Sequence, residues 1–303
     1  MITKHNYKKL VWIDVEAPTK EEVLSLMDEY RLPELVAEEL VTETYRSKVD
    51  LYNNLIYMIL HFPTVGRQGR KAEEQEIDFV LGKDFLITVH YGLIDPLHTF
   101  SKLFEVNSIL DKQVVGDHAG YLFYYIIREL YKQSALELED LNGTLRDIEH
   151  NIFAGREGEM VENISNTNRK LLDFKQAIRF HHEILKSFET AGKDFFGESF
   201  GYYLSSITGE YTKVRNILDS QKEILNDLRT TNDSLLSTKT NETIKTLTII
   251  TFIMLPLTLI TGVFGMNSDI VFIHSLHDFL IVLGAMSVTA LVMFIYFKHK
   301  RWL

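Results

Sequence analysis

The 303-residue chain contains no cysteine, which excludes disulfide bonds and metal sites built from thiolates. Its first residues, MITKHNYKKLVWIDVE, contain no apolar stretch of secretory length, so we expect no signal peptide. The chain also has no Gly-rich phosphate loop ending in Lys-Ser or Lys-Thr, no recognisable nucleophile elbow and no HExxH helix. We therefore expect a protein that is not an enzyme, with no catalytic residues and no cofactor.

An excess of basic residues is absent as well. The chain has 32 Lys and Arg against 42 Asp and Glu, and a formal net charge of -10. This acidic balance argues against nucleic acid as a partner.

Charge is missing from two long stretches near the C-terminal end, Thr246 to Asn267 and Phe279 to Phe297. About 20 apolar residues, at about 1.5 Å of helical rise each, span the roughly 30 Å hydrocarbon core of a lipid bilayer. Only Ser268 to Asp278 separates the two stretches. The sequence therefore predicts a transmembrane hairpin.

The flanking charges predict the orientation of this hairpin. Lys239 and Lys245 precede the first span, and Lys298, Lys300 and Arg301 follow the second, whereas the loop between the spans has no Lys or Arg. Positive residues mark the cytoplasmic side. We expect a multi-pass protein of the inner (plasma) membrane with both termini in the cytoplasm.

Residues 1 to about 240, which precede the spans, carry dense mixed charge. This segment is long enough for one or two domains with a real core. In the first part of this segment, alternation of apolar and polar residues and residues typical of helix starts predict mixed α/β structure. The expected strands are Lys9 to Glu16, Leu51 to Phe62, Glu76 to Leu81 and Phe85 to His90, with a hairpin around Gly82, and the expected helices are Pro18-Thr19 to about Tyr30 and Pro33 to about Leu40.

From Asp95 onward the apolar spacing becomes helical. A long helical region begins near Gly120, and Gly155 and Gly158 are expected to form a turn that returns the chain along Val161 to Phe188, antiparallel to the first helix. Ala191 to Gly201 is expected to form a second turn.

From about Phe200 no proline appears until Pro256, and apolar residues recur at helical spacing. This predicts one continuous helix of about 65 residues, which would run from the cytoplasm through the bilayer. The polar segment Thr230 to Thr243 lacks Gly and Pro, so it fits either a loop or a polar helical neck that faces water or a pore.

The expected fold class is an α+β membrane protein with an N-terminal cytoplasmic α/β domain, a long stalk helix continuous with the first transmembrane helix, and a C-terminal two-helix transmembrane hairpin. The expected segments are a mixed α/β domain (1–115), an antiparallel helical region (116–198), a stalk helix (199–245), a first transmembrane helix with its terminal motif (246–267), an extracytoplasmic loop (268–278), a second transmembrane helix (279–297) and a basic cytoplasmic tail (298–303).

The first span has two different faces when it is drawn as a helix. One stripe at 3/4 spacing carries polar and small residues: Asn241, Ile244, Thr248, Thr251, Leu255, Thr258 and Gly262. Such a stripe fits a helix that lines a pore. The alternative is an ordinary packing seam between membrane helices, where small and hydroxylated residues also occur. Two helices cannot enclose a pore, so the pore interpretation requires a cyclic homo-oligomer. Pro256 removes one backbone hydrogen bond and is expected to bend the span, either statically or for gating.

The end of this span carries a resemblance to a known family. The runs Pro256-Leu257-Thr258 and Gly262-Val263-Phe264-Gly265-Met266-Asn267, the second span and the terminal Lys-His-Lys-Arg-Trp-Leu resemble the CorA family of divalent-cation channels. The local match covers residues 241 to 303, and the general layout of the rest also fits.

The resemblance implies a homopentamer whose first span lines the pore. Gly265, Met266 and Asn267 match the family's ion-selecting signature one for one, and Asn267 would form a ring of five amides at the outer mouth. Amide oxygens can bind Mg²⁺ through its water shell, because this ion gives up its water reluctantly.

The family's pore positions carry over to Asn241, Ile244, Leu247, Leu255 and Thr258. Ile244, Leu247 and Leu255 would be hydrophobic constrictions that gate by dewetting, with Asn241 and Thr258 as polar positions between them. The implied function is passive, potential-driven uptake of divalent metal ions, Mg²⁺ first, with Co²⁺ and Ni²⁺ as further candidates. The implied partners are other copies of the chain, the bilayer and these ions.

The chain departs from the family pattern in two places. Phe264 stands where the family commonly has Tyr, and the outer loop is poorly acidic, with Asp269 as the residue expected to attract cations. His274 and His277 could ligate a transition metal if their segment is helical, but no third ligand is evident, so capping residues are the preferred interpretation. They keep open a zinc or other transition-metal transporter of the same superfamily.

The family also senses cytoplasmic Mg²⁺ through carboxylates between subunits. The acidic candidates here are Asp14, Glu16, Glu137, Glu139 and Asp140, and none is matched to that role, so the position of a regulatory metal site is unknown from sequence. The competing class is a non-transporting two-span anchor for a cytoplasmic scaffold domain, which would need no special asparagine and no polar stripe.

Overall fold

The computed structural model describes the chain except for residues 65–72, 93, 110–115, 267–275, 301 and 303. The chain divides into two compact units, Met1–Arg229 and Thr230–Leu303. The elements are β1 (Ile2–Tyr7), β2 (Leu10–Glu16), α1 (Lys20–Tyr30), α2 (Glu34–Glu39), β3 (Lys48–Leu51), β4 (Ile56–Thr64), β5 (Glu73–Leu81), β6 (Phe85–His90), α3 (Asp95–Ile109), α4 (Ala119–Phe153), α5 (Glu157–Ala177), α6 (His181–Phe196), the short 3-10 helix η1 (Glu198–Phe200), α7 (Gly201–Phe264) and α8 (Leu276–His299).

The first unit is built around a six-stranded sheet in the order β1-β2-β6-β5-β4-β3. β2 and β6 are parallel, and the other neighbouring strands are antiparallel. The predicted hairpin around Gly82 is confirmed, with the Gly82 amide donating to the Phe85 carbonyl at 2.9 Å. The Phe85 ring lies where a Cβ on residue 82 would stand, so this turn requires glycine.

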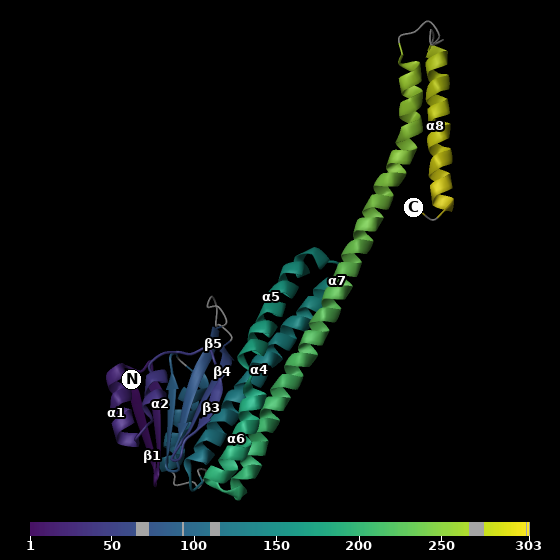
Figure 1. Ribbon diagram of the computed structural model, residues 1–303. Coiled ribbons are helices and arrows are strands. Elements are labelled where there is room, and N and C mark those ends of the chain that lie inside the picture. Colours follow the sequence, from purple (N-terminus) through teal and green to yellow (C-terminus); the bar gives the residue numbers. More distant parts are fainter. Residues whose placement is uncertain (65–72, 93, 110–115, 267–275, 301, 303) are drawn as a thin grey trace. The chain divides into compact units, whose positions relative to one another are not determined.

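Helices cover both faces of the sheet (Figure 1), and the central strands are accordingly apolar on both sides. On one face, α1 and α2 pack Val23, Leu26 and Val36 onto strand residues such as Ile13 and Ile87. The predicted start of α1 is confirmed, because Thr19 and Glu22 form a capping box.

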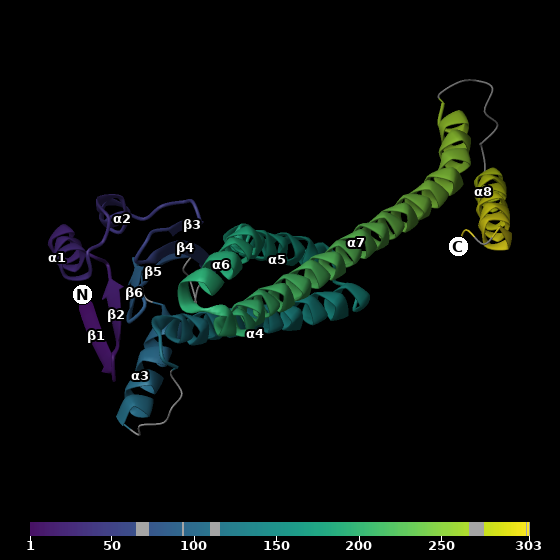
Figure 2. The ribbon, with the colours of Figure 1, turned by 60° about the horizontal axis from the view of Figure 1, so that its bottom comes forward.

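On the other face, aromatic rings join the strands to the helices. The ring centroids of Phe79 and Phe123 lie 5.1 Å apart, and those of Phe123 and Phe188 lie 5.0 Å apart. Figure 2 shows α3 beside the sheet, where Phe100 and Phe104 pack edge-on against Trp12 at 5.4 and 5.9 Å. These contacts fix α3, α4 and α6 to one side of the sheet.

Two strand predictions need correction. The run Leu51 to Phe62 is not one strand, because β3 ends at Leu51 and the chain turns before β4, with the Tyr52 amide donating to the Leu55 carbonyl at 2.9 Å. β1 was not predicted from the sequence. Its residues lie at the sheet edge and most of them are exposed, so they lack a strong alternation of apolar residues.

Two helix predictions also need correction. Val161 to Phe188 does not form one helix, because α5 ends at Ala177 and α6 begins at His181. The second turn is much shorter than Ala191 to Gly201, since α6 continues to Phe196. Gly197, with a φ of 103°, makes the break and η1 leads into α7. The apolar residues Phe195 and Phe196 extend the helix past the expected boundary.

α7 is a continuous helix of 64 residues, as predicted, and Thr230 to Thr243 lies within it. The loop interpretation of that segment is therefore wrong. In the first unit α7 buries an apolar series against the other helices: Leu204, Ile207, Tyr211, Val214, Leu218, Leu225 and Leu228. Gln221 reinforces the packing by donating from Nε2 to the Leu138 carbonyl of α4 at 2.5 Å.

The second unit pairs the C-terminal part of α7 with α8 (Figure 1). Both helices are long and apolar enough to cross a membrane. Ile249 is only 3% exposed and Phe297 only 7%, and the rings of Phe252 and Phe297 lie 6.3 Å apart. On α8 the less exposed residues follow helical spacing, namely Val282, Met286, Thr289, Met293 and Phe297.

Candidate functional site

The stripe that the sequence singled out, with Leu247 added from the family's pore positions, lies on an uncovered side of α7 within the second unit. Asn241, Ile244, Leu247, Thr251, Leu255 and Thr258 are all exposed there, and Thr248 is half-buried. Three of the apolar members expose more than half of their surface: Ile244 54%, Leu247 59% and Leu255 62%. A helix that leaves such residues bare in its own chain needs lipid or another chain to cover them.

The face of α7 turned to α8 is a different one. It carries residues of reduced exposure, namely Ile249, Ile253, Pro256, Leu257 and Ile260. At about 100° of helical rotation per residue, these five fall within a sector about 100° wide, and the stripe is centred roughly opposite to it. Packing against α8 therefore does not explain the stripe, and the seam interpretation fails for contacts within the hairpin.

The threonine hydroxyls of the stripe bond to their own helix. The Oγ1 atoms of Thr248, Thr251 and Thr258 donate to the carbonyls four residues earlier, at 2.7, 2.9 and 2.9 Å. A hydroxyl has one proton and two lone pairs, so these groups keep only acceptor capacity for anything outside the helix. The stripe contains no Asp, Glu, Lys or Arg.

At the end of α7, Gly265 and Met266 are described and Asn267 lies outside the described residues. The Gly265 amide donates to the Thr261 carbonyl at 2.8 Å, and a Cβ on residue 265 would lie 2.8 Å from that same oxygen. The first signature position is thus restricted to glycine by the way the helix ends. Met266 is 64% exposed.

Asp269 and His274 also lie outside the described residues, whereas His277 stands in the first turn of α8. Within the described parts of the chain, no group of three or more His, Asp or Glu side chains is arranged to hold a metal ion.

The carboxylates considered for metal sensing have different surroundings. Asp14 accepts from the Thr88 hydroxyl at 2.5 Å and lies 3.5 Å from Nε2 of His90, so it belongs to a network between β2 and β6. Glu137 is partly buried on α4, where burial, and to a lesser degree nearby Asp140, raise its pKa to about 7. Glu139 and Asp140 are exposed on the same helix, and Glu16 is half-buried at the end of β2.

Sequence reasoning missed a buried acidic pair on β5, formed by Glu76 and Asp78. Glu76 accepts hydrogen bonds from the Thr44 amide at 2.5 Å and from the Thr44 hydroxyl at 3.2 Å. Asp78 is completely buried, and burial, followed by the neighbouring Glu76 charge, raises its pKa well above the ordinary value. Two acids separated by one residue in the strand were the available signal, because they share one face.

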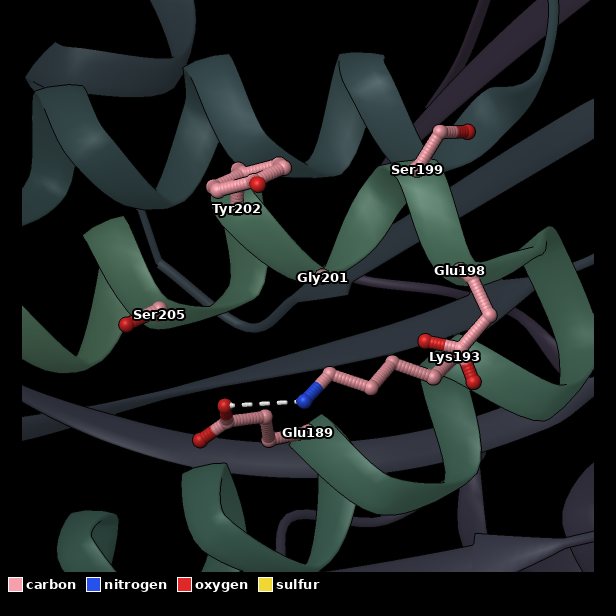
Figure 3. A pocket seen from close by; sticks show the side chains of 7 residues that line it. All are labelled: Glu189, Lys193, Glu198, Ser199, Gly201, Tyr202 and Ser205. Atoms are coloured by element: carbon pink, nitrogen blue, oxygen red, sulfur yellow. Dashed lines mark hydrogen bonds and ion pairs between the residues drawn. The ribbon is translucent and has the colours of Figure 1, made fainter.

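An open pocket of about 590 Å³ lies where α6, η1 and α7 meet (Figure 3). Its lining includes Glu189, Lys193, Glu198 and Tyr202, and Lys193 Nζ pairs with Glu189 at 3.3 Å. None of the residues predicted to bind or conduct ions lines it.

The fold and the stripe together define an integral membrane protein with a large α/β domain and a membrane hairpin. The sequence model described as "CorA-like Mg2+ transporter protein" matches residues 7–299. The chain belongs to this family.

Known proteins of the same layout resemble the chain along nearly its full length. It is 25% identical over 297 residues to the cobalt/magnesium transport protein CorA of Thermotoga maritima, covering 96% of this chain and 83% of that protein. It is also 25% identical to a putative metal ion transporter of Bacillus subtilis, over 96% of this chain and 89% of that one. The solved CorA magnesium transporter of Methanocaldococcus jannaschii has the same fold, with a TM-score of 0.84, 19% identity, and coverage of 99% and 94% of the two chains.

Proposed function

We propose that this chain is a passive divalent-cation channel that takes up Mg²⁺, with Co²⁺ and Ni²⁺ as further candidate ions. Membership of a family described as Mg²⁺ transporters supports the class of substrate. The observation that carries the channel mechanism is the uncovered, charge-free stripe on α7, which faces away from α8. A face of this kind suits the lining of a pore formed by several copies.

The proposed channel is a homopentamer in the plasma membrane, with both termini cytoplasmic and the α7 stripes around its axis. The segment boundaries proposed from the sequence follow this scheme, with residues 1–245 forming the cytoplasmic part and 298–303 a basic tail. Gly265, Met266 and Asn267 select the ion at the outer mouth through a ring of Asn267 amides, which bind the hydrated ion.

Along the pore, Ile244, Leu247 and Leu255 form hydrophobic constrictions that stop conduction when they lose water. Thr248, Thr251, Thr258 and Asn241 supply polar positions between them. An inside-negative potential drives uptake, because two positive charges gain roughly 4.6 kcal/mol per 100 mV on crossing the membrane. The mechanism therefore requires no nucleotide hydrolysis.

The test is ion flux into liposomes that contain the purified full-length chain, under an imposed inside-negative potential. Wild type is expected to conduct Mg²⁺, and Asn267→Ala is expected to lose this flux. Asn163→Ala, which changes an exposed asparagine of α5, is the matched control and should conduct normally.

The same assay separates the competing functions. Absence of Mg²⁺, Co²⁺ and Ni²⁺ flux through wild type, or unchanged flux through Asn267→Ala, would overturn the proposal as stated. Flux restricted to Zn²⁺ would indicate the transition-metal branch of the superfamily. No divalent flux at all would favour a membrane anchor for the α/β domain.

A further inference from the structure

Thr251 occupies an unusual place on the uncovered stripe of α7. The side chains four residues to either side of it are Leu247 and Leu255, both apolar and both exposed by more than half, and the half-buried Thr248 lies between Leu247 and Thr251. At about 1.5 Å of rise per residue, the two leucines stand about 12 Å apart along the axis, with Thr251 at the midpoint. Because Thr248 is half-buried, Thr251 provides the exposed hydroxyl between the two leucines.

The hydrogen bonding of Thr251 decides what this hydroxyl offers to its surroundings. Its Oγ1 donates to the Leu247 carbonyl at 2.9 Å, so its proton points to the helix backbone and its lone pairs remain for outside groups. Water bound to a cation points its hydrogens outward and needs acceptors, whereas water around an anion needs donors. An acceptor-only hydroxyl therefore suits a hydrated cation.

We propose that Thr251 forms an acceptor-only polar collar in the middle of the hydrophobic gate, and that this collar sets the barrier for hydrated cations to pass. The inference rests on the proposed channel function, which places the stripe on the pore axis. The collar divides one dry constriction about 12 Å long into two of about 6 Å each, one ending at Leu247 and the other at Leu255. Shorter apolar constrictions hold water and hydrated ions more readily.

Side-chain substitutions separate the hydroxyl from the shape of the residue. Thr251→Val keeps the branched shape and removes the acceptor, and Thr251→Ser keeps the acceptor. Thr246→Val is the matched control, since Thr246 is exposed, donates to the Glu242 carbonyl at 2.9 Å, and lies on another side of α7.

In the Mg²⁺ flux assay with liposomes, Thr251→Val is expected to conduct about tenfold more slowly than wild type, because the constriction dries over its full length. Thr251→Ser should stay within about twofold of wild type and Thr246→Val should be unchanged. Wild-type flux from Thr251→Val, with a conducting wild type, overturns the collar alone. A wild type that does not conduct overturns the channel function and the collar with it.

The absence of native cysteine permits a second readout that does not depend on flux. Thr251→Cys and Ile250→Cys place single thiols at nearly the same depth, one on the stripe and one beside it. A cationic methanethiosulfonate reagent should modify the thiol at 251 at least about tenfold faster, because only that position meets water and cations in the pore. Equal rates, or faster modification at 250, would overturn the placement of Thr251 in a wet collar.

Discussion

The two units of this chain differ in how their apolar side chains are covered and how their polar groups are hydrogen-bonded. In Met1–Arg229, a large set of apolar residues is buried by other elements of the same chain, and buried polar groups such as Trp12 and Glu76 have partners far away in the sequence. In Thr230–Leu303, many large apolar residues are exposed and the threonines bond to their own helix. The first unit can bury a core by itself, whereas the second needs lipid or other chains to cover its apolar side chains.

The largest expected effect that tests this contrast is a loss of stability on substitution in the core of the first unit. Phe79→Ala should lower the free energy of unfolding by about 3–5 kcal/mol, because the ring is completely buried against Phe123. The comparison is Val288→Ala on α8, a side chain that is 61% exposed, which should change stability by less than about 0.5 kcal/mol. Denaturant unfolding of the full chain in detergent, followed by tryptophan fluorescence, measures both. A large effect at Val288 would show that α8 is covered more than the chain alone reveals.

The next effect is a dependence of stability on pH that arises from Asp78 in the first unit. The folded pKa of Asp78 is raised by burial and by Glu76, so its contribution to stability is fully present below the unfolded pKa and is lost as pH rises through the folded pKa. Asp78→Asn mimics the protonated acid. We expect this variant to gain roughly 1–2 kcal/mol relative to wild type at pH 8 and little at pH 4.

Urea midpoints of wild type and Asp78→Asn, measured from pH 4 to pH 8, check this prediction. Asp28→Asn, an exposed carboxylate on α1, is the control and should follow wild type at every pH. A wild-type curve that rises with pH relative to Asp78→Asn would contradict the raised pKa of Asp78.

A smaller effect compares threonines of the two units. Thr19→Ala removes the cap of α1 and should cost about 0.5–2 kcal/mol of stability. Thr240→Ala replaces a hydroxyl that bonds only to the Leu236 carbonyl of its own helix, and it should be neutral or slightly stabilising because alanine has the higher helix propensity. Thermal unfolding of both variants gives the comparison, and a cost at Thr240 equal to that at Thr19 would count against it.

The smallest expected effect lies in the outer loop. Asp269→Asn should reduce Mg²⁺ uptake by about twofold at low ionic strength and have no effect in high salt, because attraction by an exposed charge is screened. Initial uptake rates at two salt concentrations measure it. Equal uptake by wild type and variant at low salt would remove Asp269 from the proposed function.

Local patterns explain which parts of the fold were predictable. The capping residues of α1, the hairpin at Gly82 and the unbroken helix α7 each depend on neighbouring residues, so the sequence predicted them correctly. The division of Leu51 to Phe62 and the break between α5 and α6 depend on packing, and apolar periodicity alone gave the wrong boundaries. Of the candidate site, the stripe on α7 could be predicted because helical periodicity places its residues on one face.

The sequence by itself determined the two apolar spans, the continuity of α7 and the resemblance at Gly265-Met266-Asn267, because hydrophobic length, helical period and a motif are properties of adjacent residues. Only the tertiary structure decided that β2 pairs in parallel with β6, that Glu76 and Asp78 are buried together, and that the stripe on α7 faces away from α8. These features depend on contacts between residues that are distant in the chain, and no local pattern encodes which partner a face will meet.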